Sequence, residues 1–213
     1  MVLTRFITLA LVLAGTGTAQ IDLGTALSFG ALAGSAVTNT GTSIVNGNVG
    51  VSPGTSISGF PPGVVTNGAV HAADATAVEA QNDALAAYNA AVSQDLGVDL
   101  TGEDLGGKTL TTGVYSFDTS AQLTGNLVLD AQGNTDSVWI FQIGSSLTTN
   151  TSASVILANG ASYCNIFWQV GSSATIGTGT SFVGNIIALT SGVTFFVVIY
   201  IGVHALSTVV YLS

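Results

Sequence analysis

One stretch of this sequence has the periodicity of an α-helix, and nearly all the rest has the pattern of short strands. Residues 72–93 are rich in Ala, and the apolar residues within them recur at helical spacing. These residues are Val78, Leu85, Tyr88 and Val92, which we expect to form the stripe that packs against the flank of the domain. Gly97 is expected to end the helix. Strands must therefore build the core.

The expected strands are separated by Gly, Asn and Ser, with a turn roughly every six to ten residues. This pattern suits a sandwich, a barrel or a β-solenoid. Asn-Gly and Asp-Gly hairpin turns are rare, which favours stacked coils, although no strict repeat period is present. The expected strands include residues 43–45, 110–115, 122–129, 137–143, 152–157, 165–170 and 180–187.

Charge is nearly absent from the second half of the sequence. No Asp, Glu, Lys or Arg follows Asp136, and the whole chain has 11 acidic residues against 2 basic ones. Such a chain is repelled by phosphate backbones, so we expect no nucleic-acid partner. The uncharged half can do little proton chemistry and cannot steer charged ligands. Its hydroxyls and methyls suit a neutral, ordered or repetitive partner.

Residues 1–19 have the features of a secretory signal peptide. Arg5 supplies the positive charge, an apolar stretch follows, and Gly17–Thr18–Ala19 forms a small-residue cleavage site. We therefore expect a secreted, extracellular protein that begins at Gln20. Cys164 is the only cysteine, so no internal disulfide can form, and its strand-like surroundings predict a buried, inert thiol.

Residues that could carry catalysis are sparse. Glu103 and Asp104 lie in a Gly-rich loop and are expected to form a solvated turn, and His71 and His204 have no metal-ligand spacing. We expect no enzyme, no catalytic residue, no metal site and no cofactor.

Several segments, in their order along the chain, carry a specific resemblance. They are residues 23–29, 33–41, 48–54, 58–63, 110–115, 139–144 and 167–171. Together they resemble the secreted ice-binding (antifreeze) protein family of fungi, bacteria and algae, over about residues 20–190. The resemblance implies an all-β-dominated fold, an irregular right-handed parallel β-helix of triangular cross-section, with the 72–93 helix alongside. It also implies that the first coil does not stack on the second but packs next to the last coils.

The resemblance implies a protein that adsorbs to ice and inhibits ice growth and recrystallisation, with no protein partner. The alternative function is a secreted adhesin or cell-wall module that binds neutral carbohydrate. Trp139, Trp168 and Phe167 could serve as sugar platforms there, although their alternation with aliphatic residues indicates core packing.

The C-terminal end departs from the family pattern. Residues 20–191 are expected to form the ice-binding domain, whereas residues 192–213 form an apolar tail without alternation, in place of the normal last coils. Two interpretations stay open: an error in the gene structure, or a tail anchor at residues 195–213 that would make a membrane a partner.

A flat, uncharged face of Thr and Ser on stacked strands would order water in rows about 4.8 Å apart. Strand alternation separates outward from inward residues but does not say which of the three sides binds ice. The outward candidates for ice binding are Thr38, Ser56, Ser58, Gln122, Thr124, Thr148 and Thr175.

Overall fold

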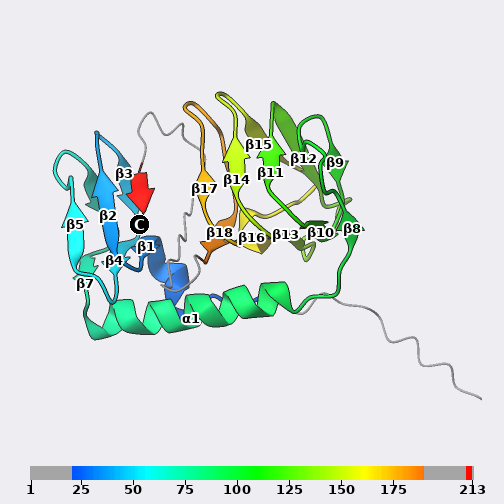
Figure 1. The fold of residues 1–213 in the computed structure, drawn as a ribbon. Helices are drawn as coiled ribbons and strands as arrows, with labels where there is room; N and C mark the ends of the chain where they lie inside the picture. The colour runs from blue at the N-terminus through cyan, green and yellow to red at the C-terminus, as the bar shows by residue number, and fades with distance from the viewer. Residues whose placement is uncertain (1–20, 190–209, 213) are drawn as a thin grey trace, which may run out of the picture.

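The computed structural model describes residues 21–189 and 210–212. It shows stacked coils of short parallel strands with one long helix along one side (Figure 1). The expected leader at 1–19, His204 and most of the tail at 192–213 lie outside the described residues. Among the residues that are described, no helix is long and apolar enough to span a membrane.

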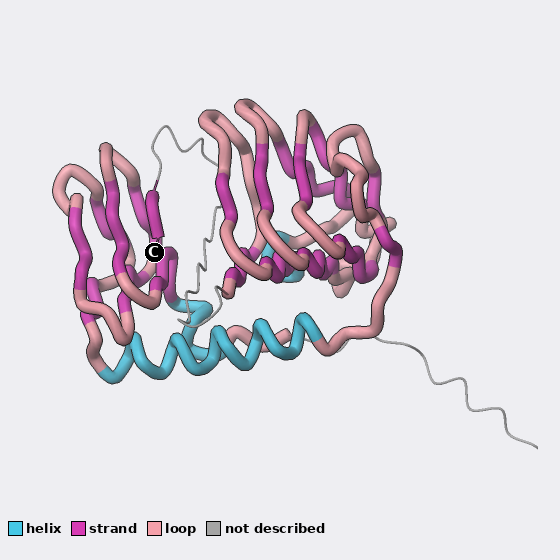
Figure 2. Tube along the Cα trace, viewed as in Figure 1, coloured by secondary structure: helices cyan, strands magenta, loops and turns pink. Residues whose placement is uncertain are grey.

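Each full coil has three sides, with one strand on each side and loops at the corners (Figure 2). The first side faces the helix and contains β1 (Phe29–Ala33), β4 (Asn48–Val51), β7 (Val70–Ala72), β8 (Val98–Asp99), β10 (Gly113–Phe117), β13 (Trp139–Ile143), β16 (Ile166–Val170) and β18 (Asn185–Ala188). The second side contains β2 (Ala36–Asn39), β5 (Ser56–Ser58), β11 (Ala121–Leu123), β14 (Leu147–Thr149) and β17 (Ala174–Thr175). The third contains β3 (Ile44–Asn46), β6 (Val64–Thr66), β9 (Thr109–Leu110), β12 (Asn126–Asp130) and β15 (Ser154–Ala158).

These pairings make the fold a parallel β-helix, as expected. Two short 3₁₀ helices, η1 (Gly24–Ser28) and η2 (Tyr163–Asn165), precede β1 and β16. Two expected strands, 110–115 and 122–129, each contain a corner and so are split between two sides. In the second of them Gly125 has a φ of 85°, a conformation open to Gly at little steric cost. The alternation of apolar and polar residues continues through this corner, so the alternation alone could not show that the strand ends there.

The coils fall into two groups, the N-terminal coils (β1–β7) and the C-terminal coils (β8–β18). Among the described strands, none of one group hydrogen-bonds with a strand of the other. The strand β19 (Val210–Leu212) pairs antiparallel with β2 of the N-terminal coils. In Figure 1, β2 lies on the side of the N-terminal coils that is nearer to β17.

The first coil stacks directly on the second. The pairs β1–β4, β2–β5 and β3–β6 are all parallel, so the expectation that these coils would not stack was wrong. Gly47 alone separates the end of β3 from the start of β4. A connection of one residue gives the chain no length to reach another coil.

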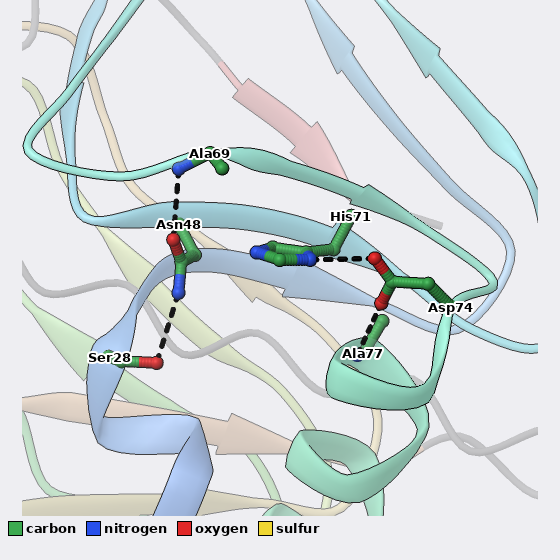
Figure 3. Close-up of polar contacts among 6 residues, drawn as sticks. All are labelled: Ser28, Asn48, Ala69, His71, Asp74 and Ala77. Atoms are coloured by element: carbon green, nitrogen blue, oxygen red, sulfur yellow. Dashed lines mark hydrogen bonds and ion pairs between the residues drawn. The ribbon is translucent and has the colours of Figure 1, made fainter.

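The helix α1 (Ala75–Val92) matches the expected 72–93 helix to within a few residues. Asp74 caps its start: one carboxylate oxygen accepts a hydrogen bond from the Ala77 N–H at 2.9 Å. The other lies 2.7 Å from Nδ1 of His71 in β7 (Figure 3). The helix ends at Ser93 rather than at Gly97. Gly97 instead lets its backbone lie close to that of Val114, since a Cβ there would lie 2.0 Å from the Val114 carbonyl oxygen.

The expected apolar stripe of α1 was wrong. Val78 and Val92 are 45% and 50% exposed, and Leu85 and Tyr88 are only partly buried. The fully buried positions are instead the alanines at 77, 80, 84, 87 and 91, which follow helical spacing of three and four. The small side chains of these alanines let the helix lie close to the first side.

Three apolar clusters form the interior. One lies inside the C-terminal coils and contains Trp139, Phe141 and Trp168. A smaller one lies inside the N-terminal coils, around Val37 and Val49. The third lies between α1 and the first side and includes residues from both groups of coils. Trp139 and Trp168 have no exposed surface, so both are core residues, as their alternation indicated.

Candidate functional site

All seven outward candidates lie on the second side of the β-helix. Four of their inward neighbours, Val37, Ala121, Leu123 and Leu147, are fully buried, and the other three, Ile57, Ala174 and Ile176, are partly buried. None of the candidates is buried. The candidates are Thr38 in β2, Ser56 and Ser58 in β5, Gln122 in β11, Thr124 directly after it, Thr148 in β14 and Thr175 in β17. The alternation predicted that these side chains point outward, and the coil topology puts them on the same side.

Strand register arranges three of these residues in a row across the C-terminal coils. Gln122 of β11 is the partner of Thr148 in β14, and Thr148 is the partner of Thr175 in β17. Neighbouring strands in a sheet lie about 4.8 Å apart, so the row repeats at that spacing. A second row begins before the strands, where the hydroxyls of Ser120 and Ser146 lie 2.8 Å apart.

The N-terminal coils carry a shorter row on the same side. Thr38 of β2 is the register partner of Ser58 in β5, and the Ser58 hydroxyl donates to the Thr38 hydroxyl at 3.4 Å. Ser56 is paired with Ala36, so that row has one hydroxyl and one methyl. In both groups the second-side strands directly follow the strands that face α1, so they lie on the same flank, as Figure 1 shows.

We call these outward residues of the second side the hydroxyl face: Thr38, Ser56, Ser58, Ser120, Gln122, Thr124, Ser146, Thr148 and Thr175. Sequence alternation missed Ser120 and Ser146 because both precede their strands. Only the register of neighbouring coils brings them together. No strand of the second side contains a charged residue among the residues that the structure describes.

Charge begins at the outer edge of the face, beside β11. Asp104 lies next to Gln122 in an isolated bridge and accepts hydrogen bonds from the backbone N–H groups of Thr124 and Gly106. Partial burial acts to raise the pKa of Asp104, but hydrogen bonds from Thr124 and Gly106 leave it below its usual value. Glu103 contacts Lys108. A shallow hollow of about 270 Å³ lies here, lined by Gly102, Glu103, Asp104, Ser120 and Gln122.

A buried network fixes the corner after β14 and β17. The hydroxyls of Thr149 and Thr180, both 3% exposed, lie 3.2 Å apart. Thr149 Oγ1 accepts from the Gly177 N–H at 2.9 Å, and Thr180 Oγ1 donates to the Asn150 carbonyl at 2.9 Å. Because these buried groups have partners, the ends of both strands are held in place next to Thr148 and Thr175.

The other two sides are less suited to an uncharged, hydrogen-bonding partner. The first side is covered by α1. The third side exposes the register pair Ile44 and Val64, at 69% and 51%, and carries the carboxylate of Asp130.

Cys164 differs from its prediction. It is exposed in η2, not buried in a strand. The strand β16 begins at Ile166, three residues after the start of the strand-like run Tyr163–Trp168 and one residue after the expected start at residue 165. Ser162 caps the short helix by accepting from the Cys164 N–H, and that turn carries the thiol to the surface.

The coil architecture and the hydroxyl face together define a parallel β-solenoid with one side whose described strands carry no charged residue. Residues 31–196 match the family described as Ice-binding-like. An ice-binding protein of Nostoc sp. (strain HG1) is 55% identical over 79% of this chain and 62% of its own length. One from Leucosporidium sp. (strain AY30) is 31% identical over 79% of this chain and 72% of its own length.

Solved structures agree. The crystal structure of an ice-binding protein from the Antarctic ascomycete Antarctomyces psychrotrophicus is 46% identical, with a TM-score of 0.76 over 79% of this chain and 82% of that one. The chain therefore belongs to the ice-binding-like protein family. Its match spans less than two thirds of the Nostoc relative, and 22% of ice-binding protein 1 from Shewanella frigidimarina.

Proposed function

We propose that this protein binds ice through the hydroxyl face and so inhibits ice growth and recrystallisation, without catalysis. We also propose that it is secreted and acts outside the cell, as residues 1–19 predict. The observation that carries the ice-binding proposal is the uncharged second side, on which rows of Thr, Ser and Gln repeat in strand register. The family of the chain supports the same function.

The chemistry of this side fits an ordered array of water. Each Thr offers a hydroxyl that can hold one water and a methyl that restricts its neighbours. A charged side chain would orient water around itself instead, and the second-side strands have none. The paired coils and the buried corner network keep the rows fixed, so little conformational entropy is lost when the face adsorbs.

Carbohydrate binding is the weaker alternative because the structure removes its best platforms. Trp139 and Trp168 have no exposed surface, and Trp168 is stacked on Phe141 with ring centroids 3.9 Å apart. A row of exposed aromatic residues, which a sugar platform needs, is absent from the second side in the part of the chain that the structure describes.

The proposal is tested by comparing two substitutions that add the same bulk on different sides. Thr148→Tyr places a large ring at the centre of the row Gln122–Thr148–Thr175, where Thr148 is half-buried. Thr109→Tyr places one on β9 of the third side, where Thr109 is exposed. Ice is grown in a slowly cooled droplet of each full-length protein. We expect faceted crystals and a gap between melting and freezing for the native protein and for Thr109→Tyr. Thr148→Tyr should lose most of that gap.

Rounded ice with the folded native protein would contradict ice binding. Equal loss in both variants, or loss in Thr109→Tyr alone, would contradict the choice of the second side. Circular dichroism of each variant checks that the β-helix is intact. A saturable response to glycans by the native protein, without faceted ice, would support the carbohydrate alternative.

A further inference from the structure

The hydroxyl face is divided between two groups of coils that the described strands do not join. Thr38, Ser56 and Ser58 lie on the N-terminal coils, whereas Gln122, Thr148 and Thr175 lie on the C-terminal coils. Each sheet of the described residues draws its coil strands from one group alone, and β19 pairs only with β2 of the N-terminal coils. Each group also has its own interior cluster. The two portions can act as one plane only if something sets their relative position.

The helix α1 contacts both groups. Its buried alanines lie in one cluster with Phe29 and Leu32 of β1 and with Ile140, Phe167 and Ile187 of the C-terminal coils. Apolar contacts are non-directional, however, and small alanine side chains offer few steric stops along the helix axis. Packing alone therefore holds α1 against the first side more firmly than it fixes its position along that side.

Two buried glutamines supply directional contacts to α1, one for each group of coils. Gln81 of α1, 8% exposed, donates from Nε2 to the carbonyl oxygen of Ala33 in β1 at 2.7 Å. Gln142 of β13, also 8% exposed, donates from Nε2 to the carbonyl oxygens of Ala91 and Gln94 at 2.9 and 3.1 Å. Gln142 thus binds one carbonyl in the last turn of α1 and one in the segment that directly follows the helix.

A further contact strengthens each attachment. The N-terminal end of α1 is tied to β7 through the Asp74–His71 pair in Figure 3. Near its C-terminal end, Tyr88 accepts a hydrogen bond from Gln169 of β16 at 2.9 Å. The helix is therefore attached to the N-terminal coils at one end and to the C-terminal coils at the other.

We propose that Gln81 and Gln142 are positioning residues that, through α1, hold the two portions of the hydroxyl face in one plane, so that both adsorb to the same ice surface. This inference rests on the proposed function. Two linked binding patches bind far more strongly than either one, provided that their geometry allows both to engage at once. Losing either glutamine should uncouple the patches while each remains intact.

The variants Gln81→Met and Gln142→Met remove the amide but keep the length of the side chain. Gln132→Met makes the same change at an exposed loop position and is the matched control. Thermal hysteresis is measured on full-length proteins whose circular dichroism at low temperature shows a folded β-helix. We expect a fall of about threefold or more for Gln81→Met and Gln142→Met, since avidity is lost. Gln132→Met should equal the native protein.

Coupling between the patches separates positioning from a general loss of stability. Ser58→Tyr blocks the N-terminal patch and should lower hysteresis clearly in the native protein. In Gln81→Met it should add almost nothing, because that patch no longer contributes, whereas Thr148→Tyr should still abolish the remainder. If Ser58→Tyr has its full effect in both backgrounds, or Gln81→Met loses stability but no hysteresis, the inference is overturned.

If Gln81→Met does not fold, the same comparison in Gln142→Met decides. Failure of the proposed function looks different: the native protein would then show no hysteresis, or Thr148→Tyr would leave it unchanged. A native protein with activity that depends on Thr148 but not on either glutamine would contradict the positioning role alone.

Discussion

The alanine surface of α1 predicts a large penalty for a modest change. Ala84 has no exposed surface and lies in the cluster between the helix and the first side. Ala84→Leu adds three carbon atoms to a side chain that is completely enclosed by its neighbours. Overpacking of this kind costs about 1–3 kcal/mol, because side chains leave their rotamers or the backbone shifts. In a protein of this size each 1 kcal/mol lowers the unfolding temperature by about 2–4 °C, so we expect a fall of about 2–12 °C.

Ala86→Leu is the control, since Ala86 lies on the same helix and is exposed. Leu and Ala have similar helix propensities, and an exposed substitution changes stability by about 0.5 kcal/mol or less. Thermal unfolding followed by circular dichroism measures both variants against the native protein. An Ala84→Leu protein that unfolds at the native temperature would refute the close-packing explanation for the alanine stripe.

Two further predictions concern the core and the helix cap. Trp168→Ala should lower the free energy of unfolding by about 3–5 kcal/mol in urea titrations, because the buried ring leaves a cavity beside Phe141 and Phe182; a change below 1 kcal/mol would contradict its place in the core. Hydrogen bonds from the Ala77 N–H and from His71 lower the pKa of Asp74 below 3.8, so its stabilising effect is present above the unfolded-state value and is lost as pH falls through the folded-state value. Urea midpoints from pH 6 to pH 2 should therefore fall more steeply for the native protein than for Asp74→Asn, and parallel curves would argue against this cap.

Much of the fold could be predicted because its signals are local. The 72–93 helix was found within a few residues, and alternation placed Val37, Leu123 and Leu147 inside. The prediction of the stripe on α1 was wrong because it looked for helical spacing among large apolar residues. Close packing of a helix on a sheet favours Ala. The expected order of the coils was wrong for another reason. It came from the family resemblance, whereas the one-residue connection at Gly47 makes the first coil stack on the second.

For the candidate residues, the sequence predicted the outward orientation but not the arrangement. Alternation along the strands predicted that Thr148 and Thr175 point outward, because successive side chains of a strand point to opposite faces. That these two residues are neighbours depends on the pairing of β14 with β17, which joins positions 27 residues apart with no sequence signal of its own. The role of Gln142 was equally hidden in the sequence. Gln142 has the pattern of an ordinary strand residue, although its amide binds the end of α1.

The distribution of charge answers two opposing demands on a protein that must stay dissolved and still leave one side without charge. With 11 acidic and 2 basic residues the chain is strongly negative, which favours solubility. The acidic residues of the described chain lie around α1, at the outer end near Asp104, on the third side at Asp130 and at corners such as Asp118, outside the second-side strands. A charged residue on β14 is therefore not needed for solubility. It would orient water around itself and disturb the water held by the row that includes Thr148 and Thr175.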